Sequence, residues 1–396
     1  MTFGEIKEEE FRKFLDGHQL KTFVQTPEMA KIRKEFGYNY YYVGVKDKSC
    51  LVAASMIGSR KNRFGMYEFY APRGLLVDYE NYDVLSFFTK ELKKFVKNKK
   101  GYILRIDPYY ITKEKDIDGN DVVNGINHEL GIMNLIKCGY KKSKHIYQQF
   151  KYMFSLDLKD SKDDIFNQFH SLPKRMIKKA EENGIVIREA TYDEIPEVEK
   201  LINETSERKN FRARNLDYYK LLYKNFHKKN QVKFMIGELD IKKYQKIRRL
   251  NIKKLQTELL DLKKQSKIDE CNKKIEKEEK LIEDSKLFKV NENNKLILSA
   301  CVFILYGDEL IYLFGGNRKE YMHYGASYLM QWTMIQYAID NGFNKYNFYG
   351  ISAVSKNDGV YSFKRGFNGY VEELIGDYEV PVSWYYYFEK LLRIIK

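Results

Sequence analysis

The most restrictive feature of the sequence is a highly charged segment, Gly237 to Phe288, that interrupts an otherwise mixed chain. A stripe of Ile and Leu this narrow cannot hold the segment in a core, but two helices folded back on each other would cover it. The segment predicts an inserted antiparallel coiled-coil helical arm at 237–290, with helices of roughly 30 Å. The stripe comprises Ile252, Leu255, Leu259, Leu262, Ile268, Cys271, Ile275 and Ile282.

The two halves of this arm differ in charge. Residues 242–267 hold ten Lys or Arg and two acidic residues, whereas residues 268–286 hold five Lys and seven acidic residues. The first half is therefore a basic rod suited to phosphate backbones. The alternative is a solvated arm whose charges only keep it soluble. The cations expected to make phosphate contacts are Lys242, Lys243, Lys246, Arg248, Arg249, Lys253 and Lys254.

The flanking sequence follows one order twice: hairpin, glycine loop, amphipathic helix, glycine with aromatic residues, strand. In the second copy the hairpin 295–318 turns at Gly307-Asp308, and a helix closed by Gly342 follows; in the first copy Gly101 is expected to end the helix that begins at 83. The repeat predicts an α+β fold with two GNAT-like (acyl-CoA N-acyltransferase fold) domains. The expected boundaries are 1–150 with 381–396 for the first domain, and 151–236 with 291–380 for the second.

The composition limits the kinds of binding partner and the cellular location that we expect for this chain. A formal charge of +15 favours polyanions: nucleic acid, a phosphorylated substrate or an anionic membrane face. The four Cys and six His show no metal-ligand spacing, which fits a reducing cytoplasm. The N-terminus has no signal-like apolar core, and no apolar run reaches the roughly eighteen residues of a membrane span. We expect a cytoplasmic protein, with peripheral contact at the inner membrane face allowed by its basic surface.

Familiar catalytic motifs are absent. There is no Gly-x-Ser-x-Gly, Walker loop or Gly-x-Gly-x-x-Gly, and YGASYL lacks the glycine pattern that holds the pyrophosphate of coenzyme A. Asp107, at a strand end, could hold or deprotonate an amine or merely cap a turn. Arg214 and Tyr218, one helical turn apart, could grip a phosphate or lie inert on the surface. Lys364 lies beside Arg365 in a glycine-bounded aromatic segment.

The stretches FYAPRG, RIDPYY, LPKRMIKKAEENGI, FGGNRKEYMHYGASYLMQWTMIQYAIDNGFNKYNFYGIS and GVYSFKRGFNGYVEELIG together resemble the FemABX family, aminoacyltransferases that build peptidoglycan interpeptide bridges. The resemblance implies transfer of an amino acid to the stem-peptide side-chain amine of a peptidoglycan precursor, lipid II or UDP-MurNAc-pentapeptide. Aminoacyl-tRNA would be the co-substrate, and no cofactor is expected. Long members carry a helical hairpin similar to the tRNA-binding arm of seryl-tRNA synthetase.

The resemblance also implies roles for single residues. Lys31 matches a lysine that contacts the diphosphate of the precursor, and Arg214 with Tyr218 matches an Arg-x-x-x-Tyr pair with the same task. Asp107 matches the aspartate of the strand-end motif. Lys364 matches a lysine that stabilises charge during transfer.

Two further positions belong to the expected substrate groove. Tyr312 matches a groove tyrosine, while Phe314 stands where a close relative has another tyrosine, so that hydrogen bond is in doubt. A separate basic run could face lipid phosphates or the tRNA acceptor stem, or simply be solvated; it contains Lys174, Arg175, Lys178 and Lys179.

Two rival functions share parts of this pattern. A coenzyme A-dependent N-acetyltransferase would have the same fold, but the missing pyrophosphate loop opposes it. A non-catalytic tRNA-binding protein would explain the charge, but not Asp107 and Lys364 within matching motifs. The sequence predicts no particular oligomeric state.

Overall fold

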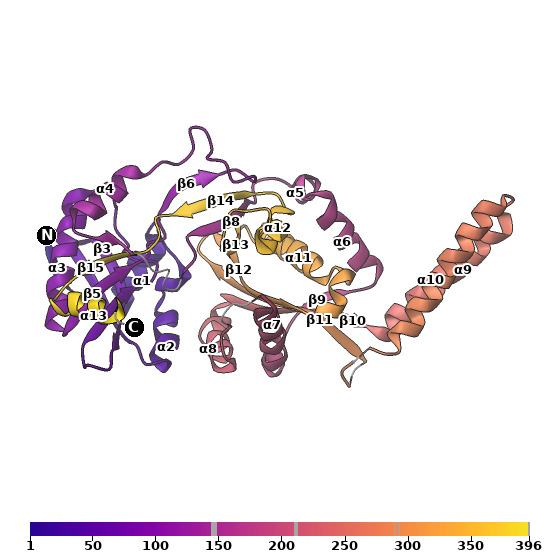
Figure 1. Ribbon diagram of the computed structural model, residues 1–396, viewed down its shortest axis with the longest axis horizontal. Coiled ribbons are helices and arrows are strands. Elements are labelled where there is room, and N and C mark those ends of the chain that lie inside the picture. The colour runs from indigo at the N-terminus through magenta and orange to yellow at the C-terminus, as the bar shows by residue number, and fades with distance from the viewer. Residues whose placement is uncertain (144–148, 210–212, 289, 293, 395–396) are drawn as a thin grey trace.

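The computed structural model shows two lobes side by side and a helical hairpin that projects from the second lobe (Figure 1). It describes residues 1–396 except 144–148, 210–212, 289, 293 and 395–396. Each lobe is built on one mixed sheet with helices on its faces.

The first lobe contains a sheet in the order β1-β2-β3-β4-β5-β15-β7. Its strands are β1 (Thr2–Glu5), β2 (Asn39–Asp47), β3 (Cys50–Lys61), β4 (Tyr67–Ala71), β5 (Gly101–Ile106), β7 (Lys141–Lys142) and β15 (Tyr378–Pro381). Its helices are α1 (Glu8–Gly17), α2 (Pro27–Glu35), α3 (Tyr82–Asn98), α4 (Glu129–Lys137) and the C-terminal α13 (Tyr385–Ile394).

The second lobe contains a sheet in the order β6-β14-β8-β13-β12-β11-β10-β9. Its strands are β6 (Ile111–Lys115), β8 (Tyr152–Asp157), β9 (Val186–Glu189), β10 (Val232–Asp240), β11 (Lys295–Tyr306), β12 (Glu309–Asn317), β13 (Lys345–Ile351) and β14 (Tyr370–Leu374). Its helices are α5 (Lys162–Gln168), α6 (Ser171–Glu182), α7 (Ile195–Lys209), α8 (Leu216–Phe226), α11 (Ala326–Asp340) and α12 (Gly359–Arg365).

The repeated order expected from the sequence is present in both lobes. In the first, β2, β3 and β4 pair antiparallel, α3 crosses over, and β5 pairs parallel with β4. In the second, β10, β11 and β12 pair antiparallel, α11 crosses over, and β13 pairs parallel with β12. The lobes also exchange strands, because β6 joins the sheet of the second lobe and β15 that of the first. The exact domain boundaries stay a prediction.

One hydrophobic cluster extends across both lobes. Buried Phe11, Met29 and Ile32 of the first lobe belong to the same cluster as Leu222 and Phe234 of the second. Separate clusters fill the far side of each sheet, under α11 in the second lobe and under α3 in the first. Because burial of apolar surface between the lobes is continuous, it stabilises their relative position.

Two helix and turn predictions had different outcomes. The hairpin of β11 and β12 does turn at Gly307-Asp308, as expected. The prediction that Gly101 ends α3 is wrong: the helix ends at Asn98, and Lys100 takes the left-handed conformation with φ 60°. Gly101 instead opens β5, where an added Cβ would lie 2.7 Å from the carbonyl oxygen of Val96. Close packing, and not helix termination, therefore explains this glycine.

The charged segment forms two long helices, α9 (Ile241–Asp261) and α10 (Gln265–Ser285), which pack against each other. Figure 1 shows them as a hairpin extending away from both lobes. Cys271 and Ile282 of the predicted stripe are buried, and Ile252, Leu255 and Leu259 are half-buried. The second helix begins three residues before Ile268, within the KQSKID stretch expected to link the helices.

Candidate active site between the lobes

Asp107 lies directly after β5 and is 1% exposed. Its carboxylate accepts a hydrogen bond from the Tyr70 hydroxyl at 2.6 Å and another from the backbone N–H of Arg73 at 2.6 Å. Parallel strands end at the same edge, so the pairing of β4 with β5 brings these residues together. Burial raises the pKa of Asp107, while the Arg73 cation and the Tyr70 hydroxyl oppose the rise. One carboxylate oxygen thus holds the end of β4 through Tyr70, and the other holds the loop that follows it through Arg73.

That loop carries Arg73, which the sequence analysis did not select. Arg73 has a left-handed φ of 56° and is 1% exposed. Its guanidinium donates a hydrogen bond to the carbonyl of Phe150 at 2.7 Å and lies 5.9 Å from the ring centroid of Tyr109. The motif FYAPRG contains this residue, but its role depends on partners far along the chain.

Lys364 lies on α12 and is 4% exposed. Its Nζ donates to the carbonyls of Gly350 at 2.7 Å and Tyr349 at 3.2 Å. Burial lowers the pKa of Lys364 to about 7, although the Asp358 carboxylate works in the opposite direction. A lysine with that pKa exchanges between its charged and neutral forms near neutral pH.

Tyr349 connects Lys364 with the Asp107 loop. It has a left-handed φ of 64°, next to a register shift between β13 and β8. Burial raises the pKa of Tyr349, the Arg73 cation opposes this rise, and Tyr218 and Asp107 reinforce it. Arg73, which is bonded to Asp107, lines the same cavity as Tyr349. Asp107, Tyr218 and Lys364, which were predicted from separate stretches, therefore gather around one residue that the prediction missed.

The helices α2 and α8 lie next to this cluster; α2 carries Arg33, whereas Arg214 lies in the loop just before α8 and not on a helix with Tyr218 as expected. The Arg214 guanidinium lies 5.1 Å from the ring centroid of Tyr218. Arg33 on α2 donates a hydrogen bond to the Tyr40 hydroxyl at 3.3 Å. Its positive charge also opposes the rise in the pKa of Tyr218 that burial causes. Burial alone would lower the pKa of Arg33, but Tyr40 and Tyr70 raise it above the ordinary value. Arg33 thus remains a charged group inside the cluster.

Lys31, the predicted diphosphate ligand, lies on another face of the same helix. It is exposed, and its Nζ is 3.5 Å from the Glu8 carboxylate. Residues two apart on a helix do not share a face, so α2 cannot present Lys31 and Arg33 to the same point. Arg33 lies three and four residues after the buried Ala30 and Met29, so it is on the side of α2 that packs against the protein.

Tyr312 and Phe314 lie in different environments. Their strand β12 has a register shift, with Phe303 opposite Tyr312 and Val302 opposite Phe314, which leaves one extra residue between them. Tyr312 consequently packs in the cluster under α11, and Phe314 packs in the interlobe cluster, 6.2 Å from Tyr218 between ring centroids. Only Phe314 is brought to the candidate site, since a β-bulge changes which face a side chain occupies.

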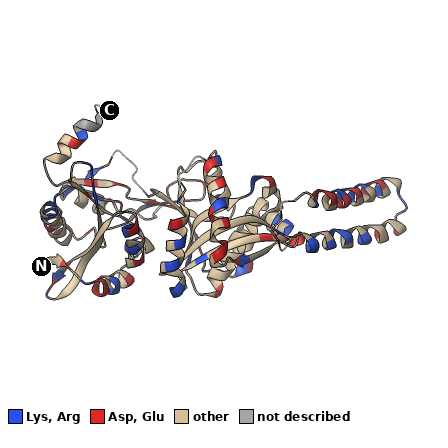
Figure 2. Ribbon diagram, turned by 90° about the horizontal axis from the view of Figure 1, so that it is seen from below, with Lys and Arg blue, Asp and Glu red and all other residues tan. Residues whose placement is uncertain are grey.

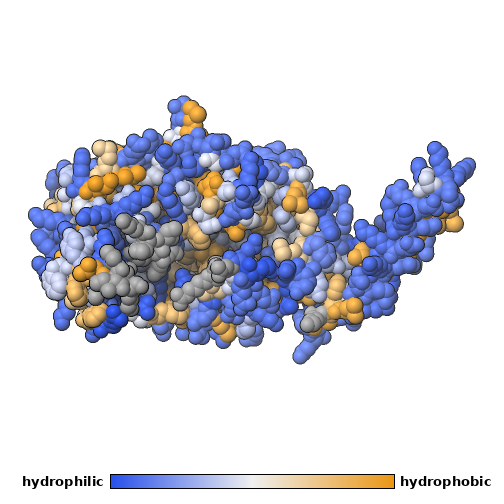
Figure 3. Space-filling model, viewed as in Figure 1, coloured by the Kyte–Doolittle hydropathy of each residue, from blue (hydrophilic) through white to orange (hydrophobic). Residues whose placement is uncertain are grey.

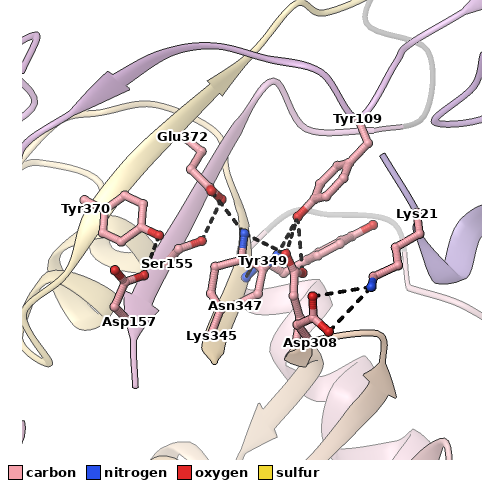
Figure 4. Close-up of polar contacts among 11 residues, drawn as sticks. Lys21, Tyr109, Ser155, Asp157, Asp308, Lys345, Asn347, Tyr349, Tyr370 and Glu372 are labelled. Carbon is pink, nitrogen blue, oxygen red and sulfur yellow. Dashed lines mark hydrogen bonds and ion pairs between the residues drawn. The ribbon is translucent and has the colours of Figure 1, made fainter. Parts of the chain in front are cut away.

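A cavity of about 400 Å³ between the lobes shares Arg73 and Tyr349 with this cluster. Its wall holds a network of polar contacts (Figure 4). The Tyr109 hydroxyl donates to Glu309, and Lys345 pairs with Glu309 at 2.6 Å and Glu372 at 3.1 Å. Burial alone would lower the pKa of Lys345, but Tyr109, Glu309 and Glu372 raise it. The acidic and basic side chains of the wall therefore neutralise one another, as expected for a contact that joins the lobes.

Most of the predicted arm cations are exposed on α9, and Figure 2 shows Lys and Arg along this helix, whereas α10 mixes both signs. Hydrophilic residues cover most of the hairpin (Figure 3). Arg248 differs from the others. It is 7% exposed, pairs with Glu278 at 3.3 Å and donates to Asn183 at 2.7 Å. These contacts attach the hairpin to the end of α6, so the Arg248 guanidinium is already paired and does not offer a free cation to a phosphate. The exposed ones are Lys242, Lys243, Lys246, Arg249, Lys253 and Lys254.

The basic run of α6 lies beside the base of the hairpin. Arg175, Lys178 and Lys179 are exposed, whereas Lys174 is half-buried and donates to the carbonyl of Asn167. Burial lowers the pKa of Lys179, and the nearby cations Lys277, Arg175 and Arg248 lower it further. The positive charge of the hairpin therefore continues onto α6.

Two further observations concern the described residues alone. No group of three or more His, Cys, Asp or Glu side chains among them could hold a metal ion. None of their helices is both long and apolar enough to cross a membrane.

Comparisons with known proteins show the family of this chain. The FemAB family matches residues 6–393. Aminoacyltransferase FemA of Staphylococcus aureus (strain MRSA252) is 30% identical over 402 aligned residues, which cover 97% of this chain and 96% of the relative.

Solved structures show the same fold. The crystal structure of FemX aligns with a TM-score of 0.76 at 22% identity, over 96% of this chain and 97% of that one. A tandem GNAT protein from the clavulanic acid biosynthesis pathway aligns with a TM-score of 0.52 at 8% identity, over 96% and 98%. The expectation of a mixed fold with GNAT-like lobes is thereby confirmed, and the chain belongs to the FemAB family.

Proposed function

We propose that this chain, an aminoacyltransferase of the FemAB family, moves an amino acid from aminoacyl-tRNA to the stem-peptide side-chain amine of a peptidoglycan precursor. The precursor would be lipid II or UDP-MurNAc-pentapeptide, met at the cytoplasmic face of the membrane. The proposal rests on the gathering of Asp107, Tyr218 and Lys364 around Tyr349 between the lobes. In this view the product is a residue of an interpeptide bridge.

The chemistry is direct aminolysis. The neutral amine attacks the ester carbonyl of aminoacyl-tRNA, a C–N bond forms, the C–O bond to the ribose breaks, and the amine proton ends on the departing ribose oxygen. Such a step needs placement and a donor aimed at the developing oxyanion, and no covalent nucleophile. Lys364 would supply that donor: its Nζ gives two hydrogen bonds to the carbonyls of Gly350 and Tyr349, which leaves the third N–H of the charged ammonium for the oxyanion.

Asp107 would act as a positioning residue. Its two oxygens are occupied by Tyr70 and Arg73, so deprotonating the acceptor amine would require one of these bonds to break. Holding the Arg73 loop against the second lobe is compatible with the bonds it has. This favours orientation over general-base catalysis, the two roles that the sequence left open.

The diphosphate of the precursor would lie near α2 and α8. Arg214 and Tyr218 fit the predicted pair, and Arg33 supplies a second guanidinium close to Tyr218. Guanidinium groups suit phosphate oxygens because they donate two parallel hydrogen bonds. Lys31 would join only as an outer cation.

The hairpin of α9 and α10 would act as a coiled-coil arm that binds tRNA. Its exposed cations lie on α9, and the positive charge continues onto α6 toward the lobe. Contacts of this kind bind phosphate backbones with a strong dependence on salt.

The rival coenzyme A-dependent reaction fits the geometry less well. A GNAT-type enzyme would bind the pyrophosphate of coenzyme A at the N-terminus of the helix that connects the two parallel strands. In the second lobe this helix is α11, between β12 and β13. Gly325 caps that helix, and an added Cβ there would lie 2.3 Å from the carbonyl oxygen of Met176 on α6. Backbone of α6 thus occupies the approach to this helix end.

The deciding experiment offers the purified chain a mixture of charged tRNAs with each precursor in turn and identifies products by mass spectrometry. We expect a precursor heavier by one amino-acid residue, dependent on charged tRNA. The Lys364→Met variant should lose roughly 10²-fold in rate, the scale of one oxyanion donor. An absence of product with every charged tRNA, together with a thermal shift by coenzyme A, would refute the proposal.

A further inference from the structure

The last helix of the chain presents an apolar face to solvent. Trp384 precedes α13 and is 74% exposed, and three side chains spaced along the same face of the helix are also exposed: Tyr387 at 59%, Phe388 at 42% and Leu391 at 55%. Phe64, in the loop between β3 and β4, adds a ring that is 52% exposed. We call these five residues the C-terminal patch. Surface hydrophobic residues are usually scattered singly, so a contiguous group indicates a binding surface.

The patch is continuous. The Phe64 ring lies 6.3 Å from that of Tyr385, which lies 5.8 Å from that of Phe388. Trp384 is 6.2 Å from Phe388, again between ring centroids. Phe64, Trp384 and Phe388 therefore meet around Tyr385, and Tyr387 and Leu391 extend the same face along α13.

The opposite face of α13 holds the helix on the first lobe. Tyr385 and Tyr386 are buried in a small cluster with Tyr102 and Ile103 of β5. The Tyr386 hydroxyl donates to Glu379 at 2.7 Å, and Asn62 donates to the Tyr385 hydroxyl at 3.3 Å. The apolar face is consequently presented on a packed support, and it is not left over from a loose terminus.

Basic residues lie near the patch, together with the acidic Glu389 of α13. The Arg63 guanidinium lies 4.7 Å from the Phe64 ring centroid, and Lys390 lies 5.5 Å from that of Tyr386. Arg60 and Lys61, at the end of β3, are exposed close by in the chain. Among the described residues, no acidic side chain pairs with Arg63. The sequence LLRIIK, which begins at the patch residue Leu391, continues the mixture of apolar and basic residues.

We propose that the C-terminal patch docks this protein on an anionic phospholipid bilayer. Aromatic side chains sit at the level of the lipid headgroups, and Lys and Arg on the rim of an amphipathic helix bind anionic lipids. The inference deepens the proposed function and rests on it in one respect, since a lipid-linked precursor places the acceptor at a membrane. The basic rim disfavours a second copy of this chain, because like charges would meet across such an interface.

The geometry leaves the hairpin free in this docked state. Figures 1 and 2 place α13 on the first lobe, at the end of the molecule remote from α9 and α10. A bilayer at one end and a tRNA at the other would not compete for space.

The chain contains a natural reporter for the test. It has two tryptophans, and the other one, Trp332, is 7% exposed and packed between Phe166 and Phe169. Wild-type protein is titrated with vesicles of phosphatidylglycerol and phosphatidylcholine, and with vesicles of phosphatidylcholine alone. We expect co-sedimentation with the anionic vesicles, a blue shift of tryptophan emission and quenching by brominated lipid. Absence of both sedimentation and emission change would overturn the proposal.

Variants separate this surface from others. Trp384→Glu with Phe388→Glu, and separately Arg63→Glu with Lys390→Glu, should each weaken binding to anionic vesicles at least about tenfold. The matched control is Met133→Glu with Ile136→Glu, which places acids on the exposed apolar side of α4 in the same lobe and should leave binding unchanged. Equal binding by all variants, or a self-association that Trp384→Glu abolishes without any vesicle binding, contradicts the proposal.

Transfer assays test the docking surface and the proposed function separately. The Trp384→Glu and Phe388→Glu double variant should match wild type on soluble UDP-MurNAc-pentapeptide and lose rate only on lipid II in vesicles. Lys364→Met should bind vesicles normally. Transfer without vesicle binding refutes the docking surface alone, and vesicle binding without transfer refutes the proposed function alone.

Discussion

The buried Lys364 makes the stability of this protein depend on pH in a direction opposite to that of a typical ion pair. Burial lowers its pKa from 10.5 to about 7. Between these values the unfolded chain keeps the Lys364 proton while the folded chain releases it. The unfolded state then binds more protons, so this group increases the stability of the fold as pH rises from 7 to 10.5.

The size of the effect follows from the same values. With pKa values of about 7 folded and 10.5 unfolded, the contribution of Lys364 becomes more favourable by roughly 3 to 4 kcal/mol between pH 7 and pH 10. A chain of 396 residues unfolds with an entropy near 0.8 kcal/mol/K, so the shift corresponds to roughly 4 °C in Tm.

The assay compares thermal unfolding of wild type and Lys364→Met at half-unit steps from pH 7 to pH 10. Methionine keeps the length of the side chain and cannot titrate, so we expect Tm of wild type minus Tm of the variant to increase by about 4 °C over this range. Lys254→Met, at an exposed lysine of α9, is the control and should run parallel to wild type. A wild-type-minus-Lys364→Met difference that stays constant within 1 °C would show that Lys364 keeps its proton when buried, and the reasoning would be wrong.

Three further predictions concern the site and the hairpin. Asp107→Asn should destabilise the fold by about 1–3 kcal/mol, because the charged acceptor of the Arg73 N–H becomes neutral and the Tyr70 hydroxyl must change from donor to acceptor; a Tm unchanged from wild type would contradict the hydrogen bonds described. Arg33→Met should raise KM for the precursor about tenfold or more at nearly constant kcat, whereas Lys31→Met should change KM less; the reverse ranking would return the diphosphate to Lys31. Reversing charge on α9 should weaken tRNA binding at least tenfold at low salt and flatten its salt dependence, whereas the matched change on α10 should do neither; the two triple variants are Lys246→Glu, Arg249→Glu, Lys253→Glu and Lys273→Glu, Lys274→Glu, Lys280→Glu.

Local sequence signals were sufficient for the elements of this fold. Period and turn chemistry located the hairpin at Gly307-Asp308, the helix closed by Gly342 and the two long helices of the charged segment. These features depend on residues that are neighbours in the chain, or one helical turn apart, so the sequence contains all of their physical causes. Residue chemistry singled out Asp107, Tyr218 and Lys364 as separate candidates, and the motif resemblance gave each of them a role.

What joins these candidates was visible only in the folded chain. Arg33, Arg73 and Tyr349 became site residues because strand pairing and the interlobe core bring distant segments into contact, and no local pattern encodes such contacts. A single extra residue in β12 placed Tyr312 and Phe314 on different sides of the sheet. The sequence by itself determined which segments are helices and strands and where charge lies. Tertiary structure decided which side chains meet and which are desolvated, because burial and pairing between lobes depend on positions that are remote along the chain.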